Sequence, residues 1–343
     1  MRIAFHFRAT RDFRRRTTDG ARGAGIADRT LTAPNVARSF RDCPRFEKDQ
    51  QMSRILVTGI TSPLGQAVGR KLKSEGHRVV GTVRSSRISS PGLPADELVA
   101  LDLEDKRSFT NINGGFDAFV HVAAASEGTA EELMTITGLG TLHLVERAKM
   151  LNVGRIIHIS SMAVYGQIRE QIATEETKIR HGRDLAAAKW AAETYIASSS
   201  CAKNSVSIRS PAIVGNRSHR HFLAQAFRAM KNQEKFITIS NPDFNLNNIV
   251  HENTFADFIN NLIESRETVR YQAFPIASTS PIQIRKIIER LAAETQYRGE
   301  IKWQYADSSP FSIDSSAAIK LGYKPLTTQA TLDLWMSQIK VKA

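Results

Sequence analysis

Apolar and polar positions follow two alternating patterns along the chain from residue 52 onward. Short apolar runs rich in β-branched residues, typical of buried strands, precede segments in which apolar residues recur every three or four positions, as in helices. Strands are expected at residues 55–57, 78–83, 98–101, 116–125, 155–159 and 206–209, and helices at 139–151, 185–193, 222–230 and 282–293. This alternation predicts an α/β fold with a doubly wound parallel sheet that is covered on both faces.

The stretch from Arg54 to Leu72 combines an expected strand, a glycine turn and the start of a helix. Its turn reads Gly59-Ile60-Thr61-Ser62-Pro63-Leu64-Gly65. Gly59 permits a tight turn, and Gly65 lets the helix pack close to the strand. The N–H groups and the dipole at the start of such a helix favour a phosphate group. The stretch therefore predicts a dinucleotide site in which Gly59 and Thr61 to Gly65 meet the phosphates.

The glycine pattern of this turn is incomplete at Ser62. The usual G-x-x-G-x-x-G spacing would have glycine at this position. Serine still offers a backbone N–H and adds a hydroxyl, but its Cβ stands where the backbone approaches the phosphates. A strand, turn and helix without a ligand is the alternative interpretation, because short patterns of this kind also occur by chance.

The second expected strand ends at Arg84, and this residue bears on the choice of cofactor. In dinucleotide-binding folds, an acidic residue about 20 residues beyond the glycines accepts the ribose hydroxyls. Here Val83 occupies that place, followed by Arg84 and, two serines later, Arg87. A guanidinium can pair with a 2′-phosphate, so we expect NADP to be favoured, with NAD possible. The alternative is a solvated arginine at the end of a strand.

The expected strand at 116–125 contains a histidine and ends in small residues. Ala123 and Ala124 would let the backbone lie close to a ligand, so we include them in the expected cofactor site. His121 lies among apolar neighbours, and we expect a packed core histidine rather than a ligand.

Composition is typical of a soluble globular protein. The chain has 343 residues, of which 41% are hydrophobic and 24% charged, enough for a sizeable core. No apolar run reaches the roughly 18 residues that a membrane span needs. Cys43 and Cys201 are the only cysteines, so we expect no disulfide framework and a reducing, cytoplasmic location.

Nearly half of the net charge of +13 lies in a short segment at the N-terminus. Residues 1–51 hold 12 Lys and Arg against 6 Asp and Glu, a net charge of +6. We expect this segment to be a disordered basic extension, or a wrongly assigned start with Met52 as the functional one. A transit peptide is the alternative, and five aspartates argue against it. Basic surface alone says little about function, so we expect no nucleic-acid partner.

The order of motifs resembles the extended short-chain dehydrogenase/reductase superfamily, in particular its NAD-dependent epimerase/dehydratase family, over nearly all of residues 53–330. The resemblance rests on Val57-Thr58-Gly59 with Gly65, Asp102-Leu103, His121-Val122-Ala123-Ala124, Gly140-Thr141, Ser160-Ser161, Val164-Tyr165-Gly166, Lys189, Arg209 with Pro211 and Gly215, Asn248-Ile249-Val250-His251 with Ala256-Asp257, and Leu321-Gly322-Tyr323-Lys324-Pro325.

The resemblance implies a Rossmann domain at 52–215 that holds NAD or NADP, with Asp102 and Leu103 in the cofactor site. A smaller C-terminal α/β substrate-binding domain at 216–343, partly interleaved with the sheet, would close over the substrate. Family substrates are often nucleotide sugars, and the chemistry moves a hydride between nicotinamide and a carbon that bears a hydroxyl or a carbonyl. A homodimer through a helix pair that includes residues 185–197 is possible.

Carried over residue by residue, the family's catalytic serine matches Ser161, and its lysine, which binds the ribose and lowers the pKa of the tyrosine, matches Lys189. The tyrosine position, four residues before the lysine, is Leu185. A leucine has no ionisable proton and cannot serve as the acid/base. This departure leaves three alternatives: an oxidoreductase or epimerase with another acid, a catalytically impaired NADP-binding relative with a regulatory or scaffolding role, or an enzyme whose reaction needs no phenol.

Three side chains are candidates for a replacement acid. They are His181, Asp184 and Tyr165. The usual pKa of a histidine suits acid/base catalysis, which favours His181. Asp184 would point about 100° away from Leu185 on a helix, and Tyr165 is more often a packing residue.

Further along, Arg217 and Arg220 could meet a phosphate or form a solvated loop. His219 and His221 lack further ligands at metal-binding spacing, so we expect no metal site.

Overall fold

A seven-stranded sheet forms the centre of the described chain, with strand order β12-β7-β5-β4-β1-β2-β3. All neighbouring strands in it are parallel. Its strands are β1 (Arg54–Thr58), β2 (Arg78–Val83), β3 (Glu97–Ala100), β4 (Ala118–His121), β5 (Arg155–Ser161), β7 (Val206–Ser210) and β12 (Gln272–Pro275). The computed structural model describes residues 52–88, 90–180, 182–216, 221–265, 267, 270–305 and 309–340.

The strand order reverses at β1. From β1 the sheet grows through β2 and β3 in one direction, and through β4, β5 and β7 in the other. In open parallel sheets this reversal opens a crevice at the carboxyl ends of the strands, where ligands bind. The predicted doubly wound α/β fold is therefore confirmed.

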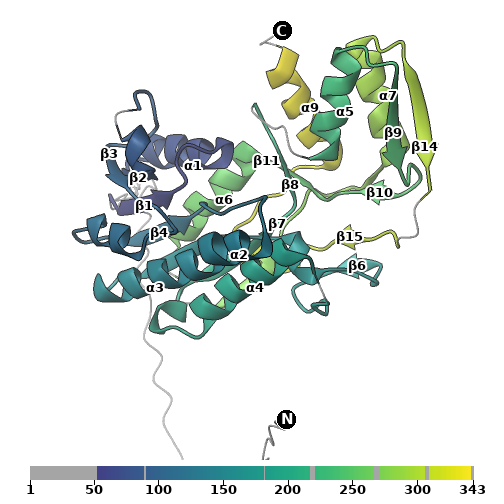
Figure 1. Cartoon of the computed structure of the whole chain (residues 1–343). Helices are drawn as coiled ribbons and strands as arrows, with labels where there is room; N and C mark the ends of the chain where they lie inside the picture. Colours follow the sequence, from purple (N-terminus) through teal and green to yellow (C-terminus); the bar gives the residue numbers. More distant parts are fainter. Residues whose placement is uncertain are drawn as a thin grey trace, which may run out of the picture. The chain divides into compact units, whose positions relative to one another are not determined.

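Helices cover both faces of the sheet (Figure 1). Alternate residues of β1 explain how, because successive side chains point to opposite faces. Ile55 and Val57 pack in one core with α1 (Pro63–Ser74) and α6 (Glu252–Glu264), whereas Leu56 packs in another. That second core contains α3 (Gly140–Met150) and α4 (Asp184–Ala197).

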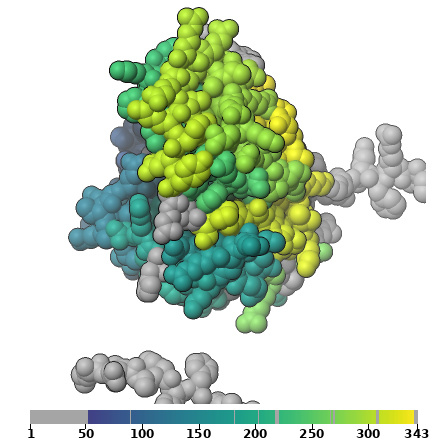
Figure 2. All heavy atoms as spheres, turned by 90° about the vertical axis from the view of Figure 1, so that its right-hand side faces the viewer, coloured from purple at the N-terminus to yellow at the C-terminus, as the bar shows by residue number. Residues whose placement is uncertain are grey.

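A second group of elements builds a separate core from the C-terminal part of the chain. It comprises α5 (Phe222–Lys231), α7 (Ile284–Thr295), α9 (Thr328–Lys340) and the two-stranded sheet of β9 (Phe236–Ser240) and β14 (Glu300–Gln304). In Figure 1 these elements gather beyond the carboxyl end of β7, and in Figure 2 green to yellow residues fill the upper part of the face turned to the viewer.

The chain links the two groups more than once. After β7, strand β8 (Ala212–Val214) pairs with β11 (Ile249–His251), and α6 and β12 then return to the main sheet. The division into domains at residue 215 stays a prediction.

Within the described residues, no helix combines the length and apolar character that crossing a membrane requires.

The remaining elements are short. They are α2 (Ala130–Leu133), the π-helix η3 (Met134–Leu139), α8 (Ser316–Lys320), strands β6 (Ile172–Ala173), β10 (Asn245–Leu246), β13 (Ile282–Gln283) and β15 (Ser312–Ile313), and the 3₁₀ turns η1 (Ser85–Arg87), η2 (Lys106–Asn111), η4 (Met162–Tyr165) and η5 (Ser200–Ala202).

Some expected boundaries were wrong. The strand expected at 116–125 stops at His121, because the next two N–H groups donate to the Thr58 side chain instead of a neighbouring strand. The helix expected at 139–151 continues a π-helix that begins at Met134. The helix expected at 282–293 starts two residues later, because residues 282 and 283 pair with β10.

Candidate functional site

A cavity of about 970 Å³ opens at the carboxyl ends of the central strands. Its volume is within the range of small-molecule sites. The residues that line it follow β1 to β5 and β7 or lie in nearby segments: Gly59, Thr61 to Leu64, Thr82 to Arg84, Leu101 to Glu104, Val122 to Glu127, Ile136, Ile159, Ser161, Pro211 to Ile213, His221 and Glu252. The cavity therefore occupies the crevice that the strand reversal creates.

Two glycines of the first turn are required by the packing around them. Gly59 has φ +69°, and a Cβ at this position would lie 2.9 Å from the backbone nitrogen of Ala123. A Cβ on Gly65 would lie 2.2 Å from the carbonyl oxygen of Gly59. Gly65 itself does not line the cavity. Its contribution is the close approach of α1 to β1, which brings the start of the helix to the cavity.

Ser62 is the N-cap of α1. Its hydroxyl accepts the Gly65 N–H at 3.0 Å and donates to the Gly59 carbonyl at 2.8 Å. Pro63 at the first helical position has no N–H to satisfy. Among the described residues, no group accepts the N–H of Leu64, which also lines the cavity. A helix start with such a free donor fits a phosphate group, so these residues fit a dinucleotide despite the missing glycine.

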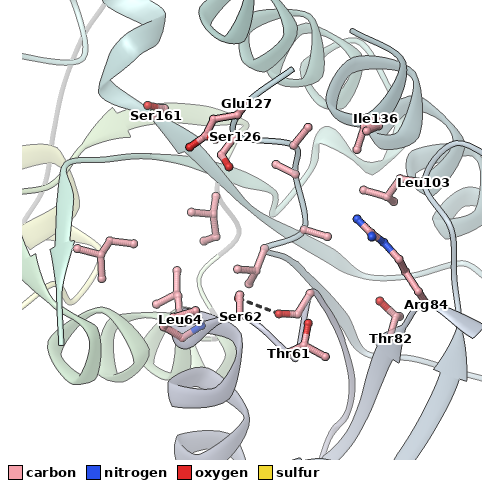
Figure 3. A pocket seen from close by; sticks show the side chains of 18 of the residues that line it. Thr61, Ser62, Leu64, Thr82, Arg84, Leu103, Ser126, Glu127, Ile136 and Ser161 are labelled. Atoms are coloured by element: carbon pink, nitrogen blue, oxygen red, sulfur yellow. Dashed lines mark hydrogen bonds between the residues drawn. The ribbon is translucent and has the colours of Figure 1, made fainter. Parts of the chain in front are cut away.

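Arg84 and Leu103 lie at one end of the cavity. Figure 3 shows the Arg84 side chain extended toward Leu103, on the side of the view opposite Ser161. Arg84 is exposed and follows β2, whereas Arg87 does not line the cavity. The Asp102 carboxylate accepts the Glu104 N–H at 3.1 Å, so it shapes the turn after β3.

The alanine segment after β4 is held by Thr58. The hydroxyl of Thr58 accepts the N–H groups of Val122 and Ala123, both at 3.1 Å. Ala123 and Ala124 then line the cavity. The His121 ring hydrogen-bonds Thr58 at 2.8 Å and is 1% exposed, which confirms the expected core histidine. Burial lowers the pKa of His121 to about 3, so its ring is neutral.

Ser161 ends β5 and lines the cavity, where its hydroxyl accepts the Ala163 N–H at 3.1 Å. Its neighbour Ser160 points to the helix face and donates to Glu193 of α4 at 2.5 Å. Glu193 also forms a buried ion pair with Arg209 of β7, with 2.8 Å between nitrogen and oxygen. The end of β5 is therefore fixed from behind by two other elements.

Lys189 and Leu185 do not line the cavity. The Lys189 ammonium donates to the Ile159 carbonyl at 2.6 Å, and only 6% of the residue is exposed. Burial lowers the pKa of Lys189 to about 8. Leu185 is half-buried one helical turn earlier. Since Ile159 does line the cavity, the lysine stands directly behind the cavity wall.

The candidates for a replacement acid lie elsewhere or outside the described residues. Tyr165 is buried, and its hydroxyl donates to the Thr174 carbonyl at 2.6 Å, which confirms a packing residue. Asp184 is exposed at the start of α4 and does not line the cavity. His181, His219, Arg217 and Arg220 lie outside the described residues.

Sequence reasoning missed several cavity residues. They are Ser126, Glu127, Ile136, His221 as a cavity residue, and Glu252. Ser126 and Glu127 directly follow the alanine segment, so extending that segment by two polar residues would have found them. Glu252 lies far along the chain from the first strands, and only the folded chain places it here. Within the described residues, no group of three or more potential metal ligands occurs.

Curated relatives resemble about a third of the chain. Sterol demethylase protein B of Methylococcus capsulatus is 32% identical over 126 residues, 35% of this chain and 38% of that protein. Uronate dehydrogenase of Pseudomonas putida is 30% identical over 119 residues, 34% of this chain and 44% of that protein. The chain thus spans less than half the length of the curated relatives it matches.

Solved structures resemble most of the chain in fold. The Bordetella bronchiseptica enzyme WbmG, in complex with NAD and UDP, superposes with a TM-score of 0.73 at 16% identity, over 85% of this chain and 96% of that one. UDP-glucose 4-epimerase of Thermus thermophilus, in complex with NAD, gives 0.69 at 18% identity, over 84% and 100%. Residues 55–249 match the model of the NAD dependent epimerase/dehydratase family. This chain belongs to that family.

Proposed function

We propose that the chain binds NADP, or alternatively NAD, along the cavity and transfers a hydride to or from a sugar or nucleotide-sugar substrate. The observation that carries this proposal is one continuous cavity that contains Arg84, the start of α1 and Ser161. A dinucleotide needs these three features in this order: a contact for the adenosine ribose, a helix start for the pyrophosphate, and a polar group beside the reacting carbon.

The adenosine end is assigned to Arg84, Asp102 and Leu103. Arg84 is an exposed cation on the cavity wall, and a guanidinium pairs well with a phosphate. This supports NADP over NAD. The pyrophosphate is assigned to the turn from Thr61 to Leu64, and Ala123 and Ala124 leave room beside it.

The reacting end is assigned to Ser161, whose hydroxyl would hold the substrate oxygen. When bound, the nicotinamide supplies the carbon that accepts or gives up the hydride. Lys189 contributes positive charge from behind Ile159 and is assigned to the ribose, a contact that requires its side chain to leave the Ile159 carbonyl. Leu185 offers no proton at this end.

The substrate class rests on the relatives. Their names include uronate dehydrogenase of Pseudomonas putida and dTDP-glucose 4,6-dehydratase of Streptomyces niveus, and WbmG was solved with UDP. These names support a sugar or nucleotide-sugar hydroxyl or carbonyl as the reacting group. We further propose a homodimer through α3 and α4, because Trp190 of α4 is 51% exposed and Leu139, just before α3, is 39% exposed. The two-cysteine composition supports a cytoplasmic location.

Titration of the full chain with NADPH and with NADH, followed by the fluorescence of the reduced nicotinamide, tests the proposal. We expect NADPH to bind more tightly, and Arg84→Ala to remove that difference. Arg87→Ala is the matched control, because Arg87 is exposed and lies outside the cavity lining. Equal affinity of both cofactors for the wild-type chain would overturn the NADP assignment. Binding of neither would overturn the proposed function.

A further inference from the structure

Glu127 is an exposed carboxylate on the cavity wall. It follows the alanine segment after β4, and it lines the same cavity as Ser161. Figure 3 shows Ser126, Glu127 and Ser161 in one part of the view, away from Arg84 and Leu103. Within the described residues, no donor hydrogen-bonds its carboxylate, which leaves both oxygens available to a ligand.

The loop that carries Glu127 is fixed on both sides. Before it, the Ala125 N–H donates to the Thr137 hydroxyl of the π-helix η3 at 3.1 Å. After it, Thr129 caps α2: its N–H donates to Glu132 at 2.8 Å, and its hydroxyl accepts the Glu132 N–H at 3.2 Å. The site therefore holds the backbone of Glu127 in place before any ligand arrives, as a reacting group requires.

Gly128 and the π-helix support the same loop. Gly128 has φ +143°, and a Cβ there would lie 2.8 Å from a Glu132 carboxylate oxygen. The chain can therefore turn sharply directly after Glu127. The π-helix, a form that is frequent at functional sites, places Thr137 where it can hold Ala125.

The other ionisable cavity residues are engaged or lie at the adenosine end. Arg84, Asp102 and Glu104 follow β2 and β3. His221 uses one ring nitrogen to accept the Ala224 N–H, and Glu252 is buried and accepts the Asn216 N–H at 3.2 Å. Among the described residues, no tyrosine lines the cavity. Within that lining, Glu127 is the carboxylate that lies with Ser161 rather than with Arg84 and Leu103.

We propose that Glu127 is the catalytic base that takes the place of the missing phenol. This inference rests on the proposed function. The hydroxyl proton of the substrate passes to the Glu127 carboxylate while the hydrogen on the same carbon leaves as a hydride to the oxidised nicotinamide dinucleotide. The carbon–hydrogen and oxygen–hydrogen bonds break, a carbonyl forms, and the dinucleotide is reduced.

Two consequences for the substrate follow from a negative charge at this end. A carboxylate accepts hydrogen bonds and donates none, so the site is suited to the oxidation of a hydroxyl. A carboxylated sugar whose anion lies beside the reacting carbon is repelled. The favoured substrate class is therefore an uncharged secondary alcohol, such as a ring hydroxyl of a neutral sugar.

The first test measures cofactor affinity in the absence of substrate. The carboxylate of Glu127 attracts the positive ring of an oxidised nicotinamide and has no such effect on the neutral reduced ring. Glu127→Gln should therefore weaken the binding of the oxidised cofactor relative to that of the reduced one, on the order of tenfold. The affinity for the oxidised cofactor is measured by its displacement of bound NADPH or NADH, which is followed by their fluorescence. Glu131→Gln is the matched control, because Glu131 is exposed on α2 and does not line the cavity.

The possible outcomes separate this inference from the proposed function. An affinity ratio in Glu127→Gln equal to that of wild type and Glu131→Gln would overturn the role of Glu127. If the wild-type chain binds neither the oxidised nor the reduced dinucleotide, the proposed function is wrong, and the assignment of Glu127 as the base is wrong with it. Where cofactor binds, a panel of sugar nucleotides whose sugar ring carries no charge gives the second test. Glu127→Gln should lower the rate of oxidation by about 10²-fold or more, and Glu127→Asp should recover part of it. Full activity in Glu127→Gln would overturn the inference.

Discussion

The Lys189 ammonium donates a 2.6 Å hydrogen bond to the carbonyl oxygen of Ile159, a residue of the cavity wall. The lysine is buried, so its positive charge has lost most of its hydration. Any contact of this ammonium with a bound ligand must replace that carbonyl bond. The buried charge also affects stability in a way that depends on pH.

We expect Lys189 to make folding more favourable as pH rises above about 8. Burial lowers its pKa to about 8 in the folded chain, below the value of about 10.4 in an unfolded one. Between these two values the unfolded chain binds more protons, so the free energy of unfolding increases with pH, by up to roughly 3 kcal/mol. The measurement is urea denaturation from about pH 7.5 to about pH 10.5, a window that spans both pKa values, compared with Lys189→Met. Parallel curves for the two proteins would contradict this assignment.

The buried pair of Arg209 and Glu193 should be strongly coupled. Replacing Glu193 alone by Met leaves a buried guanidinium without its partner, which should cost about 3–5 kcal/mol of unfolding free energy. Replacing both residues by Met should recover part of that loss, because no unpaired charge remains. Denaturant unfolding of the two single variants and the double variant gives the coupling. A double variant whose loss equals the sum of the single losses would show that the pair is not coupled.

Ser62→Gly should bind the cofactor more tightly and fold slightly less stably. The variant removes the Cβ that stands where the backbone approaches the phosphates, and it also removes the hydroxyl that accepts the Gly65 N–H. Replacing an N-cap serine by glycine costs only a few tenths of a kcal/mol. Cofactor titration and thermal unfolding measure the two effects. Weaker binding by the variant would mean that the hydroxyl itself contacts the cofactor.

Leu185→Tyr should raise turnover chiefly in the Glu127→Gln background, where the proposed base is absent and a phenol at position 185 would restore an acid/base group. Position 185 lies one helical turn before Lys189 on α4, and a positioned acid/base contributes on the order of 10²–10⁴ in rate. The assay is the change in nicotinamide absorbance with a panel of sugar nucleotides. Leu185→Phe is the control, because it adds the ring without the hydroxyl. Equal rates in the two variants would exclude the phenol as the cause of any gain.

The fold and one side of the site could be predicted from the sequence. Gly59, Arg84, Ala123 and Ser161 each follow or end an expected strand, and the carboxyl ends of parallel strands meet at one edge of the sheet. The periodicity that identifies the strands therefore also gathers these residues around the cavity. All four line it.

Other parts of the site depend on contacts that a linear pattern does not contain. Lys189 lies at the expected position of its helix, but its ammonium donates to the Ile159 carbonyl instead of lining the cavity. The π-helix that holds Ala125 is too short, at six residues, to show a periodicity of its own. Glu127 could not be placed from the pattern either, because its position is set by Gly128 and by the Thr129 cap rather than by a strand.

Strand β12 completes the sheet next to β7, although β7 ends at Ser210 and β12 begins only at Gln272. When the ribosome has synthesised the chain only as far as Gly215, β12 does not yet exist, and the β7 edge of the sheet is still open. Open edges recruit other strands and promote aggregation. We therefore expect the C-terminal part of this chain to protect the nascent protein, so truncations before Pro275 should accumulate in inclusion bodies even when every residue of the glycine turn is intact.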